Sequence, residues 1–399
     1  MPQAELRNDR SSRTRPARPR ADNRGSGDGS AILDDGHEML VPDHPPRSGD
    51  LDAGTETLTR EDAATDVAPQ RKARPNRKKK KKKSKRRKAF EYRMRLFLYR
   101  VRVAIENMLW WLVAPAVWLV FRSLRALGPD RASNLGGWFT RTLGPLLPVH
   151  RVGQDNLRHA YPDKSEAERE AILREAWDNL GRTAADYAHL KDLWDFDPEA
   201  GDAGRIDVSG IDNFVKLRED GKPAIIFTAH LGNWELPAIC ASRHGLPVTA
   251  VYRAPSNPYV ARQIEKIRSR NMGNLLQAGS GQAVIFKMAS VLERGGHLGI
   301  LVDQHLRRGL KIPFFGRTAS TNPSLGRLAR RFECPVHGVR VIRLPGNRFR
   351  LELTDALELP RDHEGAVDVE GTMRMVNGIV EGWVREHPGQ WLWLHRRWR

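Results

Sequence analysis

The segment T-A-H-L-G-N-W-E at residues 228–235 holds the residue types that acid–base chemistry needs. His230 follows a short apolar run, and Glu235 stands five positions later. A histidine beside a carboxylate suits a general base that takes a proton from a substrate hydroxyl, with the carboxylate orienting the imidazole. A metal site would need more ligands at close spacing, and the sequence has no H-E-x-x-H segment. The plain alternative is a structural histidine in a strand-to-helix turn.

The residues between this pair fit a binding role. Gly232 permits close approach of a backbone, and Asn233 can cap a helix that begins at Trp234. Pro237 is compatible with that helix because it falls in the first turn. The turn would then offer backbone N–H groups and the positive end of a helix dipole to an oxyanion or a phosphate.

Short apolar runs that alternate with helical segments predict an α/β fold with a mostly parallel central sheet flanked by helices. We expect strands over 224–229, 247–252, 297–302, 335–342 and 348–354. We expect helices near 234–244, 257–270, 281–294 and 323–332, and an earlier helix within 165–191 that starts with a Ser165–Glu168 capping box. His230 then lies at the carboxyl end of a strand, where active sites of open α/β sheets collect.

Charge is distributed very unevenly along the chain. Residues 1–70 carry 9 Lys/Arg against 14 Asp/Glu, residues 71–102 carry 18 against Glu91 alone, and residues 103–399 have a net charge of only +7. The high isoelectric point therefore describes one short segment and does not make the whole protein a polyanion binder. We expect residues 1–89 to be a disordered tail, because they are polar, rich in Arg, Pro, Gly and Ser, and without sustained periodicity.

An uncharged apolar segment of 14 residues follows at 108–121, rich in tryptophan. With its flanks it approaches the roughly 20 residues that a membrane span needs, and Pro115 in its middle would kink a helix. A polybasic stretch directly before such a helix favours attachment to anionic lipid. We expect a membrane-associated segment over 90–127; a buried core helix is the alternative. The α/β domain then covers 128–399.

The two cysteines, Cys240 and Cys334, are too few for a disulfide framework. The first ninety residues contain no early apolar stretch, so we do not expect a cleaved secretory signal. The small number of cysteines fits a reducing compartment.

Several stretches, in order, resemble the lipid A biosynthesis (lauroyl/myristoyl) acyltransferase family, within the larger group of glycerolipid-type acyltransferases that share an H-x4-D/E motif. The stretches are N-L-R-H-A-Y-P at 156–162, T-A-H-L-G-N-W-E at 228–235, V-Y-R-A-P-S-N-P at 251–258, L-V-D-Q at 301–304, P-F-F-G-R at 313–317 and W-L-W-L-H-R-R-W at 391–398. The resemblance covers roughly residues 105–399.

The resemblance implies transfer of a fatty acyl group from acyl carrier protein to a hydroxyl of a lipid A precursor, on a 3-hydroxyacyl chain already attached to the sugar. It implies that His230 is the general base, that Glu235 pairs with His230, and that the attack is direct, without metal, cofactor or covalent intermediate. It also implies a functional arginine near 268–270 and a functional aspartate at Asp303.

The acceptor is anionic, and arginine suits phosphate through bidentate hydrogen bonds. The candidate substrate-binding residues are therefore Arg253, Arg268, Arg270, Asp303 and Arg317, together with Gly232 and Asn233. The sequence does not choose between Arg268 and Arg270. The tryptophans of 391–398 fit either a membrane-facing surface or the core.

Acyl carrier protein is cytoplasmic, so the resemblance places the catalytic domain on the cytoplasmic face of the inner membrane. Because basic residues flank both ends of the apolar helix, the charge rule does not orient it. A monotopic or re-entrant helix would keep tail and domain on one side.

Two other functions remain open from the sequence alone. One is a related acyl-CoA-dependent enzyme acting on phosphatidylinositol mannosides or glycerolipids. The other is a membrane-tethered scaffold or nucleic-acid-binding protein that uses the lysine run, although aromatic residues for base stacking are absent from that run. We expect membrane lipids as partners and no specific nucleic acid.

Overall fold

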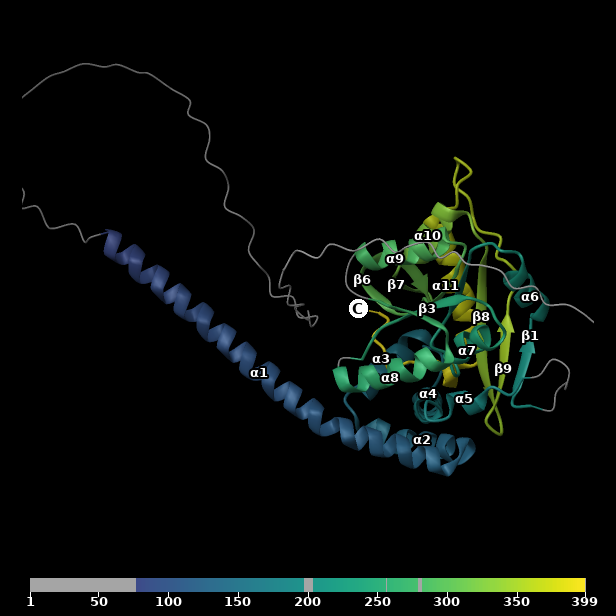
Figure 1. The fold of residues 1–399 in the computed structure, drawn as a ribbon, viewed down its shortest axis with the longest axis horizontal. Coiled ribbons are helices and arrows are strands. Elements are labelled where there is room, and N and C mark those ends of the chain that lie inside the picture. Colours follow the sequence, from purple (N-terminus) through teal and green to yellow (C-terminus); the bar gives the residue numbers. More distant parts are fainter. Residues whose placement is uncertain (1–76, 197–203, 256, 279–281, 399) are drawn as a thin grey trace, which may run out of the picture. The chain divides into compact units, whose positions relative to one another are not determined.

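The computed structural model describes residues 77–196, 204–255, 257–278 and 282–398 (Figure 1). The helices are α1 (Arg77–Leu127), α2 (Pro129–Leu143), α3 (His150–Ala160), α4 (Glu166–Asp186), α5 (Leu190–Leu193), α6 (Ile211–Glu219), α7 (Leu236–Arg243), α8 (Pro258–Asn271), α9 (Gln282–Glu293), α10 (Ser324–Phe332) and α11 (Val369–Glu386), with 3-10 turns η1 (Gly144–Leu146) and η3 (Pro388–Gln390). The strands are β1 (Ile206–Ser209), β2 (Ala224–Thr228), β3 (Val248–Tyr252), β4 (Asn274–Gln277), β5 (His297–Leu301), β6 (His305–Phe314), β7 (Arg317–Thr321), β8 (Val336–Leu344) and β9 (Arg348–Leu353).

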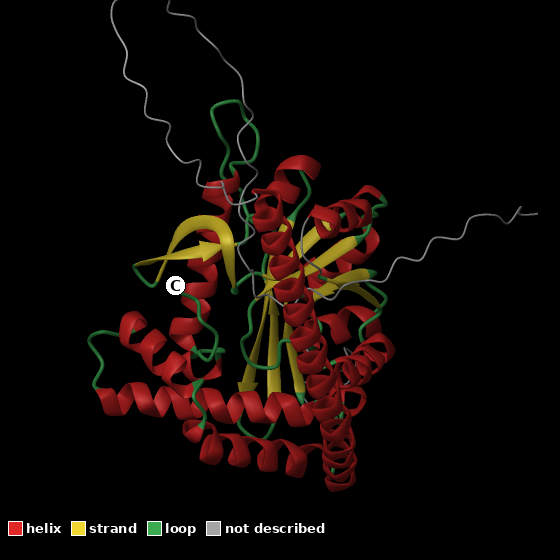
Figure 2. Cartoon of the chain, turned by 90° about the vertical axis from the view of Figure 1, so that its left-hand side faces the viewer, coloured by secondary structure: helices red, strands yellow, loops and turns green. Residues whose placement is uncertain are grey.

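Seven strands form one sheet in the order β1-β9-β8-β2-β5-β3-β4. Only the β8–β9 pair is antiparallel, so the predicted mostly parallel sheet is confirmed. Strands β6 and β7 form a separate two-stranded sheet, and Figure 2 shows the main sheet enclosed by helices. Strand β2 lies between β8 and β5, which places the end of β2 in the middle of the sheet edge.

Strand β2 illustrates how the sequence builds a core on both faces of the sheet. Ile225 and Phe227 join one buried cluster, and Ala224 and Ile226 join another. Side chains alternate between faces along a strand, so four consecutive apolar residues serve both layers. Helices α9, α10 and α11 contribute to the first cluster, and α6 and α7 contribute to the second.

The predicted strands and helices of the α/β domain are found within a few residues of their expected bounds. The Ser165–Glu168 capping box at the start of α4 is present in both directions. The elements that were not anticipated include the edge strands β1 and β4, the β6–β7 hairpin, the helices α2, α3, α5 and α6, and the long helix α11.

Helix α1 changes the expected boundary of the tail. It begins at Arg77, inside the segment predicted to be disordered, and continues through Pro115 to Leu127. Lys and Arg are good helix formers, so the basic run can extend the helix that follows it. Over Phe90–Leu127, α1 is long and apolar enough to cross a membrane. The remainder of the predicted tail, residues 1–76, lies outside the described residues.

Helices α2 and α4 cross at unusually close range. A Cβ atom on Gly181 of α4 would collide with Thr140 and with the carbonyl of Gly136 on α2. Thr140 Oγ1 also donates a hydrogen bond to the carbonyl oxygen of Trp177 at 2.6 Å. Only glycine leaves enough room for this contact between two backbones.

We predict that Gly181→Ala lowers the free energy of unfolding by about 1–3 kcal/mol, because the added methyl group has no space. The control is Gly378→Ala, since a Cβ on this exposed glycine of α11 would meet nothing within 4 Å. The control should raise stability by up to about 1 kcal/mol through helix propensity. Denaturant unfolding of both full-length variants measures the difference, and equal effects would contradict the close-packing argument.

Candidate active site

Two sheet neighbours bring the central histidine and an aspartate together. His230 follows β2 and Asp303 follows β5, and these strands pair in parallel with Thr228 opposite Leu301. The carboxyl ends of parallel strands meet at one edge of the sheet, so the two side chains converge there. The Nδ1 atom of His230 lies 2.8 Å from Oδ1 of Asp303.

Asp303 is almost completely buried and is held by three hydrogen bonds. Besides the His230 ring, its Oδ2 accepts from the backbone N–H of His230 and from Nε1 of Trp391, each at 2.8 Å. Burial alone would raise the pKa of Asp303, but the charge and hydrogen bonds of His230, with Trp391, lower that pKa well below its ordinary value. The carboxylate is therefore ionised and fixes both the backbone and the ring of the histidine.

The other ring nitrogen of His230 lies beside Gln304. Nε2 lies 3.2 Å from Nε2 of Gln304, and the imidazole packs against the Trp234 ring with centroids 5.2 Å apart. With Nδ1 bonded to a carboxylate, the proton belongs on Nδ1 and Nε2 is an acceptor. Nε2 is then the atom that can take a proton.

Glu235 does not take the expected place beside His230. Its carboxylate accepts from Nε of Arg268 at 3.1 Å, from Nη2 of Arg268 at 2.5 Å, from the Tyr187 hydroxyl and from the Trp234 indole. The expected His230–Glu235 pairing is thus corrected: the carboxylate on His230 is Asp303. Glu235 stands at the start of α7, and its carboxylate bonds to Arg268 of α8.

Of the two candidate arginines on α8, Arg268 is the one that contacts the other site residues. Its guanidinium lies 5.7 and 5.3 Å from the ring centroids of Tyr187 and Tyr252 and forms an ion pair with Glu235. Arg270 is exposed on the same helix. Burial first, and then the charge of Glu235, raise the pKa of Tyr187 well above its ordinary value, so this hydroxyl stays protonated as a donor.

The amides of the turn are already used within the protein. The backbone N–H of Gly232 donates to the carbonyl of Gln390 at 3.1 Å, and Gly232 has a φ of 57°, a conformation that favours glycine. The Asn233 side chain is fully buried and donates to Asp186 at 3.0 Å. The expected use of Gly232 and Asn233 to bind an anion is therefore corrected: they hold the turn in place.

A buried polar network behind the turn was missed in the sequence. Nη2 of Arg343 lies 2.9 Å from the same Asp186 oxygen that accepts from Asn233, and Nε of Arg343 donates to Asn179 at 3.0 Å. Asn179 in turn donates to the carbonyl of Gly232 at 3.0 Å. Asp186 and Asn179 belong to α4 and Arg343 belongs to β8. Because these elements are far apart in the sequence, no local motif predicts the network.

The remaining predicted residues lie at the surface. Arg253 is exposed directly after β3, which neighbours β5, so it shares the sheet edge with His230 and Asp303. Arg317 is exposed at the start of β7 in the separate hairpin. Among the described residues, no group of three or more His, Cys, Asp or Glu side chains is arranged to hold a metal ion.

The tryptophans of the C-terminal segment belong to the core. Trp391, Trp393 and Trp398 are buried, which decides between the two alternatives left open by the sequence. Arg397 beside them is fully buried, and its guanidinium donates to Ser320 and Thr321 of β7. The segment thus ties the hairpin to the sheet edge that carries Asp303.

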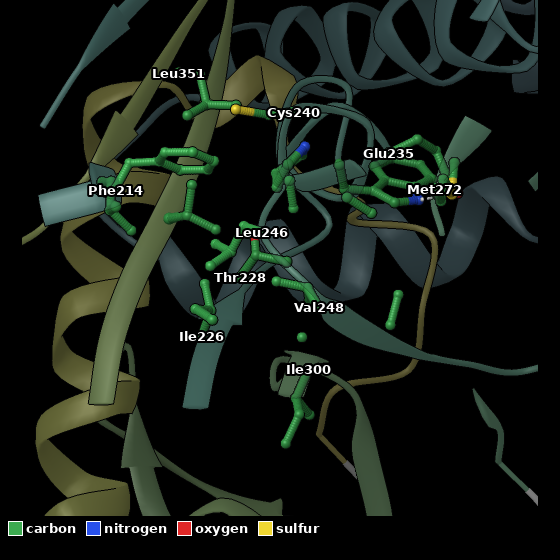
Figure 3. Close-up of a pocket in the computed structure, with 18 of the residues that line it drawn as sticks. Phe214, Ile226, Thr228, Glu235, Cys240, Leu246, Val248, Met272, Ile300 and Leu351 are labelled. Atoms are coloured by element: carbon green, nitrogen blue, oxygen red, sulfur yellow. Dashed lines mark hydrogen bonds between the residues drawn. The ribbon is translucent and has the colours of Figure 1, made fainter. Parts of the chain in front are cut away.

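A narrow apolar cavity adjoins the turn (Figure 3). It has a volume of about 100 Å³. Figure 3 shows Phe214 and Leu351 at one side of it and Glu235 and Met272 at the other. Trp234, which packs on His230, and Arg268 also line it. The histidine therefore stands next to a space suited to a hydrocarbon chain.

Comparison with known proteins identifies the family. The model of the bacterial lipid A biosynthesis acyltransferase family matches residues 97–399, three quarters of the chain. The chain belongs to this family. The whole sheet and every residue of the candidate site lie within the matched part. This membership establishes an acyltransferase of lipid A biosynthesis.

Individual relatives agree with the family assignment. The chain is 26% identical over 259 residues to the lipid A biosynthesis palmitoleoyltransferase of Escherichia coli, covering 62% of this chain and 78% of the relative. It is 26% identical over 246 residues to the lipid A biosynthesis myristoyltransferase of the same organism, covering 60% and 72%. A lipid A biosynthesis acyltransferase of Haemophilus influenzae is 23% identical over 309 residues, covering 71% and 89%.

We expect His395 to make the stability of this acyltransferase depend on pH. Its Nε2 accepts from the backbone N–H of His305 at 2.9 Å, so the ring is neutral. Burial lowers the pKa of His395 to about 4, against the opposing pull of Asp303. The ordinary pKa of a solvated histidine, which applies to the unfolded chain, is about 6.5. As the pH falls below 6.5, the unfolded chain binds this proton first, and stability is lost until about pH 4.

We therefore predict that the free energy of unfolding decreases between pH 6.5 and about 4, and that His395→Gln weakens this decrease. Glutamine can still accept from the His305 amide but does not titrate. Denaturant melts across this pH range, with the exposed His363→Gln as the control, measure the difference. Parallel pH curves for wild type and His395→Gln would contradict the assignment.

Proposed function

We propose that this enzyme transfers a fatty acyl chain from acyl carrier protein to a hydroxyl on a 3-hydroxyacyl chain of a lipid A precursor, with His230 as the general base. The observation that carries the proposal is the His230–Asp303 pair, whose imidazole packs on Trp234, a residue in the wall of an apolar cavity. A base, its orienting carboxylate and a place for a hydrocarbon chain are the components that acyl transfer to a hydroxyl needs.

The proposed reaction is a direct displacement at the thioester carbonyl. His230 Nε2 removes the proton of the acceptor hydroxyl while its oxygen attacks the carbonyl carbon. Asp303 stabilises the imidazolium that forms, as in a Ser-His-Asp triad. The C–S bond then breaks, the proton on His230 passes to the departing sulfur, and the ester and the free thiol of the carrier leave. Gln304 must give up its place at Nε2 when the hydroxyl binds.

We assign a charge-stabilising role to Arg268. Its guanidinium is oriented by Glu235 and Tyr187 and lines the polar end of the cavity, so it can face the negative charge of the tetrahedral intermediate. Glu235 acts on this reaction through Arg268 and is a positioning residue. Arg253, exposed at the same sheet edge, remains the candidate for a phosphate of the acceptor.

The cavity offers the acyl chain its binding energy. Its lining is apolar apart from a few groups at one end, and each buried methylene contributes about 0.8 kcal/mol. Two of the relatives are named for palmitoleoyl and myristoyl transfer, so acyl selectivity of this kind is a reasonable property of the chain. The acyl length follows from the depth of the cavity.

The proposed setting is the cytoplasmic face of the inner membrane. The donor protein is acidic and cytoplasmic, and the catalytic part of the chain is mildly basic, which favours encounter with such a partner. The apolar part of α1 fits a membrane attachment next to the lipid acceptor.

We predict that His230→Ala lowers kcat by about 10²–10⁴-fold, because a positioned general base contributes that much. The measurement is acyl transfer from acyl carrier protein to a lipid A precursor, followed by mass spectrometry of the product. His363→Ala, at an exposed site, should leave kcat unchanged. A wild-type rate for His230→Ala would end the proposal, and faster transfer from acyl-CoA would instead favour the related glycerolipid-type enzyme.

Double-mutant cycles separate the two carboxylates in the same assay. Asp303→Asn should be strongly non-additive with His230→Ala, and Glu235→Gln should be non-additive with Arg268→Ala, since each pair acts as a unit. The cross pair His230→Ala with Glu235→Gln should be closer to additive. Strong coupling in that cross pair would restore the His230–Glu235 partnership expected from the sequence.

We predict that Ala238→Leu shifts selectivity toward shorter acyl chains, because Ala238 lines the cavity from α7. The rate ratio between consecutive even-numbered chains should change by about fourfold for each methylene excluded. Leu246→Ala, which removes atoms from the lining of the cavity, should shift the selectivity toward longer acyl chains. Ala171→Leu on the exposed face of α4 is the control, and unchanged profiles for both cavity variants would place the acyl chain elsewhere.

A further inference from the structure

Helix α2 turns its small residues, and not its large apolar ones, toward the rest of the protein. Its buried residues are Ala132, Ser133 and Gly137, and Gly136 touches the backbone of α4. A helix on the surface of a water-soluble domain turns its large apolar side chains toward the core. Here the small residues face the protein, and the large ones are left outside (Figure 1 shows α2 beside α4).

The outward side chains form one continuous apolar surface, which we call the platform. Its members are Leu135, Trp138, Phe139, Leu143, Leu146 and Leu147, all exposed, with Leu146 at 79%. The first four follow the i, i+3, i+4, i+8 spacing of a single helix face, and the last two extend it through η1. An exposed apolar patch of this kind marks an interaction site.

We infer that the platform inserts into the interfacial region of a lipid bilayer, as a second membrane contact separate from α1. Its tryptophan and leucines are the residue types that sit at the boundary between headgroups and acyl chains. Arg131, Arg141 and Arg151 are exposed on the same segment and suit anionic headgroups. This inference concerns membrane attachment and does not depend on the chemistry assigned to His230.

Continuity with α1 favours a bilayer over another protein as the occupant. α2 follows α1 after Gly128 and contacts it, and the apolar part of α1 leaves its side chains unburied in the structure. α1 also contacts α8, the helix that supplies Arg268. Helix α1 is therefore a neighbour both of the helix that carries the platform and of α8. A membrane that holds α1 and the platform would lie close to an element of the candidate site.

The test is site-directed spin labelling of the full-length protein. Cys240 and Cys334 are buried, so a nitroxide reagent reacts at an introduced cysteine. Leu146→Cys and Trp138→Cys report on the platform, and His363→Cys, 90% exposed on a polar loop, is the matched control. The protein is reconstituted in vesicles of phosphatidylethanolamine and phosphatidylglycerol, and the label's collisions with oxygen and with a water-soluble nickel chelate are compared.

We expect the platform labels to be more accessible to oxygen than to nickel, and the control label to show the opposite order. Platform labels that remain accessible to nickel in vesicles would overturn the inference. Labels shielded from both reagents, with spin–spin broadening, would identify a second copy of the chain as the occupant and would also overturn it.

An activity measurement separates this inference from the catalytic proposal. Trp138→Gln combined with Leu146→Gln should reduce transfer to an acceptor embedded in vesicles, on the order of tenfold. Transfer to an acceptor dispersed in detergent micelles should be unchanged, since neither residue belongs to the catalytic site. Equal losses in both assays would indicate damage to the fold and contradict a membrane role, whereas loss of activity in His230→Ala would leave the labelling result unaffected.

Discussion

The structure of this acyltransferase depends on the burial of one carboxylate. Asp303 has almost no contact with water, so its charge must be met by hydrogen bonds and by a positive neighbour within the protein. Its three donors come from two places in the sequence, the backbone and ring of His230 and the indole of Trp391. The carboxylate thus fixes the turn after β2, the end of β5 and the C-terminal segment relative to one another.

The C-terminal segment also helps to hold the turn after β2, a role that the sequence did not predict. The Gln390 carbonyl accepts from the Gly232 amide, and the Leu392 amide donates to the His230 carbonyl, so the segment runs along the turn that carries His230. Arg397 anchors the end of the segment: burial lowers the pKa of its guanidinium to about 10, while Asp303 partly opposes this. Its buried hydrogen bonds to β7 offset part of the desolvation cost, and the charge is retained at neutral pH.

The sequence predicts the position of His230 well because the signal is local. An apolar run that ends in a polar turn defines a strand end, and parallel strand ends converge whatever their loops contain. The same logic correctly placed Asp303 and Arg253 at this edge. The expected pairing of Glu235 with His230 was wrong because the spacing of two residues in the sequence does not show which way their side chains point. After β2 the chain turns into α7, and the Glu235 side chain at the start of α7 points toward α8. The Asp186–Arg343 network could not be found, since it joins positions 157 residues apart.

Charge balance explains why Glu235 pairs with Arg268 while Asp303 pairs with His230. Arg268 is charged at every accessible pH, and its enclosure between two tyrosine rings leaves it in need of a permanent anion, which Glu235 provides. If Glu235 bonded to His230 instead, the guanidinium would be buried without a counter-ion, at a cost of several kcal/mol. Asp303 is therefore left to hold His230. The Arg268–Glu235 ion pair and the His230–Asp303 pair are separate units, and in the proposed mechanism the proton moves only on the second.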